Sequence, residues 1–412
     1  MAEAASRTAK AVVTGLGVIA PNGMGVEDYW TATLKGVSGI APISRYDAGG
    51  YASRLAGEVP GFIASEHLPS RLLPQTDHMT RMALVAADWA LADAGVDPAD
   101  LPEFGMGVVT ASSSGGFEFA QNELQKLWSK GPEYVSAYQS FAWFYAVNTG
   151  QISIRNGMRG PSGVLVTEQA GGLDAIAHGR RHIRKGTGLV VTGGVDASLC
   201  PWGMVSQMTS GRLSRSSDPE RAYVPFDTSA DGYVPGEGGA LLIVEDESAA
   251  LERDARILGT VAGYGSTFDP APDSGREPAL GRAIEIALAD AGVAPDEVDV
   301  VFADAAGLRD LDRLEAATLA RIFGPYGVPV TAPKTMTGRL YSGAASLDAA
   351  AALLSMRDSV IPPTLHVTDL ADDCPIDLVR DSAREADVRT ALVVARGLGG
   401  FNSALVLRAH DA

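Results

Sequence analysis

The sequence predicts an α/β fold in which buried strands alternate with longer helices. The chain has 412 residues, of which 46% are hydrophobic and 20% are charged, enough apolar side chain for more than one ordinary core. Short runs rich in Val and Leu alternate with segments of helical periodicity. Because these short runs lack polar–apolar alternation, they are typical of strands covered on both faces.

The apolar runs predict nine buried strands, and six periodic segments predict helices between them. The first strand ends where Pro21, Asn22 and Gly23 favour a turn. The expected strands cover residues 11–19, 106–110, 164–167, 189–192, 240–244, 257–263, 298–303, 390–395 and 403–407. The expected helices cover residues 82–94, 119–128, 172–185, 281–291, 310–322 and 344–356.

The length favours two halves within one chain. We expect them to divide in the charged stretch of residues 245–256, which gives an N-terminal half of residues 8–250 and a C-terminal half of residues 251–409. The sequence shows no repeat between the two halves that we can recognise.

Charge and cysteine usage exclude several classes of function. The net charge is −17, whereas proteins that bind nucleic acids or anionic membranes need clustered Lys and Arg. No run of 18 apolar residues predicts a transmembrane helix. Arg7 and Lys10 precede an apolar stretch, residues 11–20, that fits a buried strand better than a signal peptide. Cys200 and Cys374, the only cysteines, indicate reduced thiols in the cytoplasm.

Two patterns look like binding sites but favour simpler interpretations. Residues 15–20 fit the Gly-x-Gly-x-x-Ala fingerprint of dinucleotide sites, yet Pro21 breaks the helix entry and Lys35 lies in the region of the expected acid. We therefore expect a tight strand-ending turn and no nicotinamide cofactor. His178 and His182 lie four residues apart without an HExxH pattern, which favours a polar helix face over a metal site.

Gln169 occupies a position where a nucleophile would be expected. The strand at residues 164–167 runs into a glycine-loosened turn and then into a helix. Such a turn aims one side chain outward at a helix N-terminus, where N–H groups stabilise an anion such as a thiolate. Gln is a neutral amide that cannot ionise, attack a thioester or hold an acyl group. The segment therefore has the expected geometry of a nucleophile elbow but lacks a side chain that can act as the nucleophile.

This elbow resembles that of the β-ketoacyl synthases of the thiolase-like fold, in which Cys takes the place of Gln169. Further similar segments occur in the family's order along nearly the whole chain, at residues 12–18, 225–227, 231–238 and 397–403. The resemblance implies two related α/β halves in a layered αβαβα arrangement.

Condensing members of this family use two His residues beside the Cys to decarboxylate a malonyl extender. The resemblance puts Asp304 at the first His position and Arg339 at the second. An ionised carboxylate would repel a developing enolate, and Arg can bind an anion but cannot exchange protons near neutral pH. The surrounding frame still matches the family at Asp312, Arg313, Glu315, Lys334 and Gly338. A synthase that uses Cys200 instead is the alternative, but neither a base nor a helix N-terminus is evident beside that thiol.

The combination resembles the chain length factors, the β subunits of the ketosynthase heterodimers in bacterial type II aromatic polyketide synthases. Residues 115–119, 138–144 and 167–172 carry this closer resemblance. It implies a subunit that condenses nothing itself, binds no cofactor and pairs with a catalytic α subunit. The malonyl and polyketide groups would arrive on the phosphopantetheine of an acyl carrier protein, which would dock mainly on the α subunit.

In the family, side chains of the β subunit close a tunnel at the dimer interface and limit the polyketide length. The matching residues are Phe117, Ala120, Leu124 and Trp202, and the first three have the spacing of one helix face. Octaketide-forming relatives carry Phe, Thr and Phe at the three helical positions. The smaller Ala120 and Leu124 therefore predict a longer tunnel, for a decaketide or longer product, unless this face is ordinary packed core.

Two other functions remain open from the sequence. Gln at the nucleophile position also occurs in loading domains that decarboxylate malonyl-carrier protein, so Gln169 could hold a thioester carbonyl while an acetyl primer forms. Asp304 and Arg339 are poor groups for the enolate that this reaction needs. The chain could also be a scaffold that stabilises its partner without touching substrate.

Overall fold

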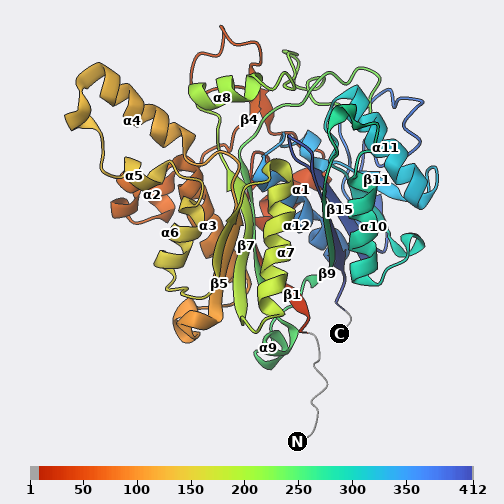
Figure 1. Ribbon diagram of the computed structural model, residues 1–412, viewed down its shortest axis with the longest axis horizontal. Helices are drawn as coiled ribbons and strands as arrows, with labels where there is room; N and C mark the ends of the chain where they lie inside the picture. The colour runs from red at the N-terminus through yellow and green to blue at the C-terminus, as the bar shows by residue number, and fades with distance from the viewer. Residues whose placement is uncertain (1–8, 411–412) are drawn as a thin grey trace, which may run out of the picture.

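The computed structural model describes residues 9–410, so Arg7 and the expected first residue of the N-terminal half, Thr8, lie outside it. Two sets of five strands form the centre of the molecule (Figure 1). The first set has the spatial order β1 (Ala11–Ala20), β8 (Gly238–Asp246), β7 (Leu189–Asp196), β5 (Met106–Ala111) and β6 (Ser162–Leu165). The second has the order β9 (Gly259–Phe268), β16 (Phe401–Arg408), β15 (Thr390–Arg396), β10 (Val300–Phe302) and β11 (Pro329–Thr331).

The two sets have the same topology. In each set, the first strand in the chain is followed in space by the last, the fourth, the second and the third. In each set, the first two neighbouring pairs are antiparallel and the next two are parallel. Short pairing between β1 and β9 joins the sets. The expected two related halves are therefore confirmed, whereas their exact boundaries stay a prediction.

Helices form three layers around these strands, which confirms the αβαβα arrangement. On the outer faces, α3 (His78–Asp93) packs on β1 and β8, and α10 (Leu280–Ala291) packs on β9 and β16. Between the sets, α7 (Gly171–Ile183) and α12 (Ser342–Asp358) contact each other and strands of both sets, as Figure 1 shows. All side chains of α12 up to Ser355 are buried, as expected for a helix enclosed on every side.

The remaining elements surround this core. The helices are α1 (Val26–Leu34), α2 (Ala64–His67), α4 (Phe117–Lys130), α5 (Gln139–Ala142), α6 (Val147–Arg155), α8 (Pro201–Met208), α9 (Glu247–Glu252) and α11 (Arg309–Phe323). The short strands are β2 (Gly23–Met24), β3 (Ile40–Pro42), β4 (Leu55–Gly57), β12 (Val360–Ile361), β13 (Asp377–Leu378) and β14 (Arg384–Glu385). In Figure 1, α4 projects from the upper left of the molecule, away from the strands.

All nine expected strands and all six expected helices occur, with shifted ends. The strand expected at residues 164–167 is β6, which lies two residues earlier. The helix expected from residue 82 begins at His78, because the Asp77 carboxylate caps it by accepting a hydrogen bond from Met79 N at 2.8 Å.

The strand-ending turn expected at residues 15–20 is wrong. Gly15 and Gly17 lie inside β1, which continues to Ala20. A Cβ atom at either glycine would collide with the backbone of α3, at Ala90 and Ala86 respectively. The glycines therefore let a helix lie close against the strand.

The same close contact between strand glycines and a helix occurs in the second half, and it reveals a repeat that the sequence analysis missed. A Cβ at Gly263 or Gly265 in β9 would collide with the backbone of α10, at Ala287 and Ala283. Each half thus begins with a Gly-x-Gly strand, followed by a helix with Ala at four-residue intervals. The repeat consists of small residues at contacts between elements, which is why the surrounding sequence hides it.

Two further properties of the described elements bear on function. Within residues 9–410, no helix combines the length and the apolar composition that crossing a bilayer requires. In the part of the chain that the structure describes, β6 lies at the end of the strand order and pairs only with β5. Its outer edge therefore leaves backbone groups without a strand partner.

Candidate functional site

The elbow around Gln169 has the predicted order of elements. A 3₁₀ turn, Glu168–Ala170, connects the segment after β6 to the first residue of α7. Glu168 has φ of 54°, a left-handed conformation that is rare for residues other than glycine and that makes the turn sharp. Gly172 allows this turn to lie against α12, because a Cβ there would come within 2.6 Å of Ser342 O.

The side chain of Gln169 does not point outward as expected. The residue is 2% exposed, and among the described residues its Nε2 has no hydrogen-bond partner. Glu168 faces the neighbouring cavities instead, and its carboxylate accepts a hydrogen bond from Leu398 N at 2.7 Å. The turn thus buries the amide that replaces the nucleophile and presents the preceding carboxyl group.

Asp304 and Arg339 form one buried ion pair. Arg339 Nη2 lies 2.9 Å from Asp304 Oδ1, and Nη1 lies 3.3 Å from Oδ2. Arg339 Nη1 also donates to the Asp304 carbonyl at 2.8 Å. The two side chains are 3% and 4% exposed. The guanidinium of Arg339 is thus neutralised by the Asp304 carboxylate, and its capacity to bind an anion from a substrate stays a prediction.

The frame around this pair is tightly hydrogen-bonded. Glu315 accepts hydrogen bonds from Asp304 N at 2.7 Å and Ala305 N at 2.9 Å. Lys334 donates to the carbonyl oxygens of Ala303 and Asp304 and lies 2.7 Å from the Asp348 carboxylate. The frame residues that match the family thus hold the backbone of Asp304 in place, whatever side chain it carries.

Burial and charge shift the pKa values of the acids at this site in opposite directions. The Arg339 guanidinium, helped by Lys334, outweighs burial and holds the pKa of Asp304 below its usual range. Burial raises the pKa of Glu168, although Arg339 partly opposes this. Burial and the nearby Asp304 raise the pKa of Glu315 to about 7. Asp304 is therefore a fixed carboxylate and not a group that exchanges protons near neutral pH.

Glu168 lines two cavities. One of about 110 Å³ is lined by Asp304, Arg339 and the loop of residues 396–401. The other, of about 610 Å³, is lined by Phe117, Tyr341 and several hydroxyl-bearing side chains. Gln169 lines neither cavity.

The structure brings together two of the four expected gate residues directly. The rings of Phe117 and Trp202 lie 4.8 Å apart, between α4 and α8. Ala120 is buried and Leu124 is partly buried on α4. Only Phe117 of the four lines the cavity of about 610 Å³. The chain alone therefore contains a paired aromatic contact at the expected gate.

Cys200 lies at a helix N-terminus, contrary to expectation. It is the residue that precedes α8, and it is 7% exposed. Burial nevertheless raises its pKa to about 11, so the thiol stays protonated near neutral pH. This protonation disfavours Cys200 as a replacement nucleophile.

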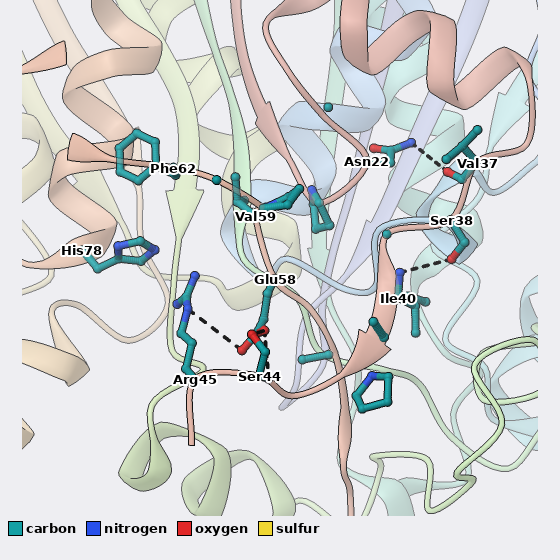
Figure 2. A pocket seen from close by; sticks show the side chains of 18 of the residues that line it. Asn22, Val37, Ser38, Ile40, Ser44, Arg45, Glu58, Val59, Phe62 and His78 are labelled. Atoms are coloured by element: carbon teal, nitrogen blue, oxygen red, sulfur yellow. Dashed lines mark hydrogen bonds and ion pairs between the residues drawn. The ribbon is translucent and has the colours of Figure 1, made fainter. Parts of the chain in front are cut away.

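A larger cavity, of about 770 Å³, lies away from the elbow (Figure 2). Arg45 pairs there with Glu58 at 3.9 Å and with the buried Glu237, which belongs to the family's mid-chain motif. His78 Nε2 lies 3.4 Å from Glu237, and against the effect of burial the contacts with His78 and Arg45 hold the pKa of Glu237 down at about 2. Figure 2 shows the pair of Arg45 and Glu58 with His78 nearby.

Comparison with known families agrees with this geometry. The model of the β-ketoacyl synthase N-terminal domain matches residues 9–250, and that of the C-terminal domain matches residues 258–368. The chain belongs to the β-ketoacyl synthase family. The elbow lies in the first matched region, and Asp304 and Arg339 lie in the second.

Within this family, the similarity to ketosynthase β subunits is high. The chain is 63% identical over 407 residues to the tetracenomycin polyketide synthase ketoacyl synthase beta subunit of Streptomyces glaucescens, covering 98% of this chain and 100% of the relative. It is 32% identical over 416 residues to the 3-oxoacyl-[acyl-carrier-protein] synthase 2 of Staphylococcus aureus, covering 99% and 100%.

Solved structures give the same result. The ishigamide ketosynthase/chain length factor superposes with a TM-score of 0.89 at 30% identity, covering 98% of this chain and 100% of that one. The complex AntDE:AntF, a type II acyl-carrier protein with its ketosynthase bound to the hexaketide, superposes with a TM-score of 0.87 at 26% identity, with the same coverage.

The sequence analysis missed several residues of this ketosynthase-like site. Glu168, Tyr233 and Arg396 line the small cavity, and Arg339 lies over the Tyr233 ring at 5.4 Å. Tyr233 could have been found, because it belongs to the mid-chain motif at residues 231–238. Glu168 also lies in a matched segment, residues 167–172, but its exposure to the cavities follows from a left-handed backbone that the sequence does not predict.

Proposed function

We propose that this chain is the non-condensing β subunit of a minimal type II polyketide synthase and pairs with a catalytic ketosynthase α subunit. The observation that carries the proposal is the buried pair of Asp304 and Arg339 beside an elbow with Gln169. No residue of this set can capture an acyl group or supply a neutral imidazole to an enolate. The similarity to the tetracenomycin β subunit supports the same role.

Two kinds of exposed surface, the edge of β6 and a group of aromatic side chains, support the pairing. This strand offers an unpaired edge, and Val166, four residues after its start, is 44% exposed. Exposed aromatic side chains follow α4 in the chain, at Tyr134, Tyr138, Trp143, Phe144 and Tyr145. Exposed apolar surface of this kind is typical of interfaces, and an interface in this fold would bury more than about 2,000 Å² in total.

The polyketide would reach the pair as a thioester on the phosphopantetheine of an acyl carrier protein. Carrier proteins are typically acidic, and this chain has a net charge of −17. Repulsion between the two therefore favours docking mainly on the α subunit. We place the complex in the cytoplasm, where the free thiols of Cys200 and Cys374 would stay reduced.

The chain would set product length through Phe117, Ala120, Leu124 and Trp202. A growing poly-β-ketone that extends from the partner's cysteine would stop where rigid side chains close the tunnel. The contact between Phe117 and Trp202 provides such a closure. Small side chains at Ala120 and Leu124 leave room before it, so we expect a decaketide or a longer product.

Enlarging the two small gate residues tests this role. In the heterodimer, Ala120→Thr combined with Leu124→Phe should shift the product mixture to shorter polyketides, measured by mass spectrometry of the released products. Gln125→Phe adds similar bulk to an exposed position of α4 and should leave the lengths unchanged. Unchanged lengths in the double variant of an intact heterodimer would favour the scaffold function instead.

A second candidate is decarboxylation of malonyl-carrier protein to make an acetyl primer. It is favoured by one observation, the buried Nε2 of Gln169, which has no partner among the described residues and could donate to a thioester carbonyl. The paired Asp304 and Arg339 oppose it, because the pair leaves no free donor for the enolate. Carbon dioxide release from malonyl-carrier protein, lost in Gln169→Ala, would establish this activity.

A further inference from the structure

The two helices that carry the gate residues, α4 and α8, each donate a backbone hydrogen bond from the first turn to a side chain outside the helix. Asp77 caps α3 and also accepts a hydrogen bond from Phe119 N of α4 at 2.7 Å. Asp77 is 1% exposed, and a Cβ at Gly116 would come within 2.9 Å of it. The N–H groups in the first turn of a helix need such acceptors from outside the helix. One carboxylate thus fixes the start of α4 to a helix of the core.

Gln121 connects α4 to α8 in the same way that Asp77 connects α3 to α4. Its Oε1, on α4, accepts a hydrogen bond from Trp202 N at 2.7 Å. Trp202 is the second residue of α8, so its N–H has no acceptor within its own helix. The residue before it is Pro201, which has no N–H to offer. Gln121 is therefore the side chain that fixes the first turn of α8 to α4.

The other end of α8 is also fixed. Gln207 donates to Ser198 O at 2.9 Å and to Ser198 Oγ at 2.8 Å. The hydroxyl of Tyr341 donates to Gln207 Oε1. At its first turn, the backbone of α8 is joined to α4 by the hydrogen bond from Trp202 N to Gln121.

We infer that Gln121 is a positioning residue for chain length, a role that rests on the proposed function. Its amide acts through the backbone of Trp202, a residue that is 42% exposed and whose ring lies against Phe117. Without the bond, α8 can move away from α4 and the two rings separate. The tunnel then closes at more than one depth, and products of more than one length are released.

The test compares three variants in the heterodimer with the α subunit. Gln121→Leu removes the acceptor at similar volume, whereas Gln121→Glu keeps an oxygen acceptor in reach of Trp202 N. Gln125→Leu makes the same change one turn later on α4, where the side chain is exposed. Loss of one hydrogen bond shifts an equilibrium by roughly two- to tenfold. We expect the ratio of the main product to all others to fall by that factor in Gln121→Leu alone.

The product lengths of these variants test the role of Gln121 separately from the proposed gate. If Gln121→Leu and Gln121→Glu both keep the wild-type distribution, or if Gln125→Leu broadens it equally, the inference is overturned. If Ala120→Thr with Leu124→Phe shortens the products while Gln121→Leu has no effect, the gate stands and only the role of Gln121 fails. If none of these variants changes the lengths, both proposals fail. Should Gln121→Leu not yield heterodimer, Gln121→Ser replaces it, because its hydroxyl is too short to reach.

Discussion

Arg339 and Asp304 depend on each other because both charges are buried. Removal of one partner from a buried pair leaves an uncompensated charge, which destabilises proteins by about 3–5 kcal/mol. Removal of both leaves only unpaired backbone groups, here the Arg396 N–H that donates to Asp304 at 2.9 Å.

We therefore expect Arg339→Met to lower the unfolding free energy of the heterodimer by about 3–5 kcal/mol. The double change Asp304→Leu with Arg339→Met should lose less than Arg339→Met alone. Urea unfolding followed by circular dichroism measures both. A double variant less stable than the single one would show that the two charges do not form an essential pair.

Single residues could be assigned from the sequence wherever a motif surrounds them. The motifs identified Gln169, Asp304 and Arg339 as replaced positions, and the structure places them in one region. The contact between Asp304 and Arg339 could not be predicted, because 35 residues separate them and each motif describes only its own segment. The burial of Gln169 was also missed, because it follows from the left-handed φ of Glu168.

The start of α11 carries two acids whose burial makes stability depend on pH. Burial raises the pKa of Asp312 to about 7, although Phe226 N and Gly307 N each donate to it at 3.0 Å. The pKa of Glu315 is also about 7. Folded pKa values above the unfolded ones mean that folding takes up protons. The stabilisation is complete below about pH 4 and is lost as the pH rises through 7.

The melting temperature of the heterodimer should therefore fall between pH 5 and pH 8. Asp312→Asn cannot ionise and should make this decline less steep. Asp310→Asn removes an exposed acid from the same helix, 93% exposed, and should follow the wild-type curve. Glu237 does not interfere, because its pKa of about 2 confines its effect to more acidic solutions. Equal slopes in Asp312→Asn and wild type would contradict the assignment.

The contact between β1 and α3 tolerates no side chain at Gly17. A methyl group there would collide with the backbone of Ala86, and neither element can move without disturbing the core. We expect Gly17→Ala to lower the melting temperature strongly or to prevent recovery of soluble protein. Gly150→Ala in α6 meets no atom within 4 Å and should be neutral or stabilising by about 0.4–1 kcal/mol. Similar behaviour of the two variants would refute this packing argument.

Elements with a clear apolar run or helical period were predictable from the sequence, and elements without one were not. The buried helix α12 has Ala and Leu throughout its length, and β8 is a continuous apolar run. In contrast, β11 has three residues and α8 has eight, too few for a period to be recognised. This explains why the helix that begins after Cys200 was missed.

At the scale of the molecule, the edge of β6 and the exposed aromatic side chains require a partner. Such surface associates with other chains when its own partner is absent. Expressed alone, the chain should therefore form mixed oligomers or aggregates, whereas co-expression with the α subunit should give one heterodimer peak in size-exclusion chromatography. A dispersed, stable monomer would count against the heterodimer.

The duplicated topology could be expected only from the family resemblance. Each half conserves strand order and the close contact between its first strand and helix, while most other residues differ. Gln169 comes from the first half, and Asp304 and Arg339 come from the second. The site therefore forms only when α7 and α12 bring the halves together.

The paired charges of Asp304 and Arg339 also bear on how such a subunit evolves. A single change to His at either position would leave the opposite charge without its partner in the interior, so the variant would be destabilised before any catalytic group was complete. Condensing chemistry could therefore be introduced only by changes at both positions, together with a cysteine in place of Gln169.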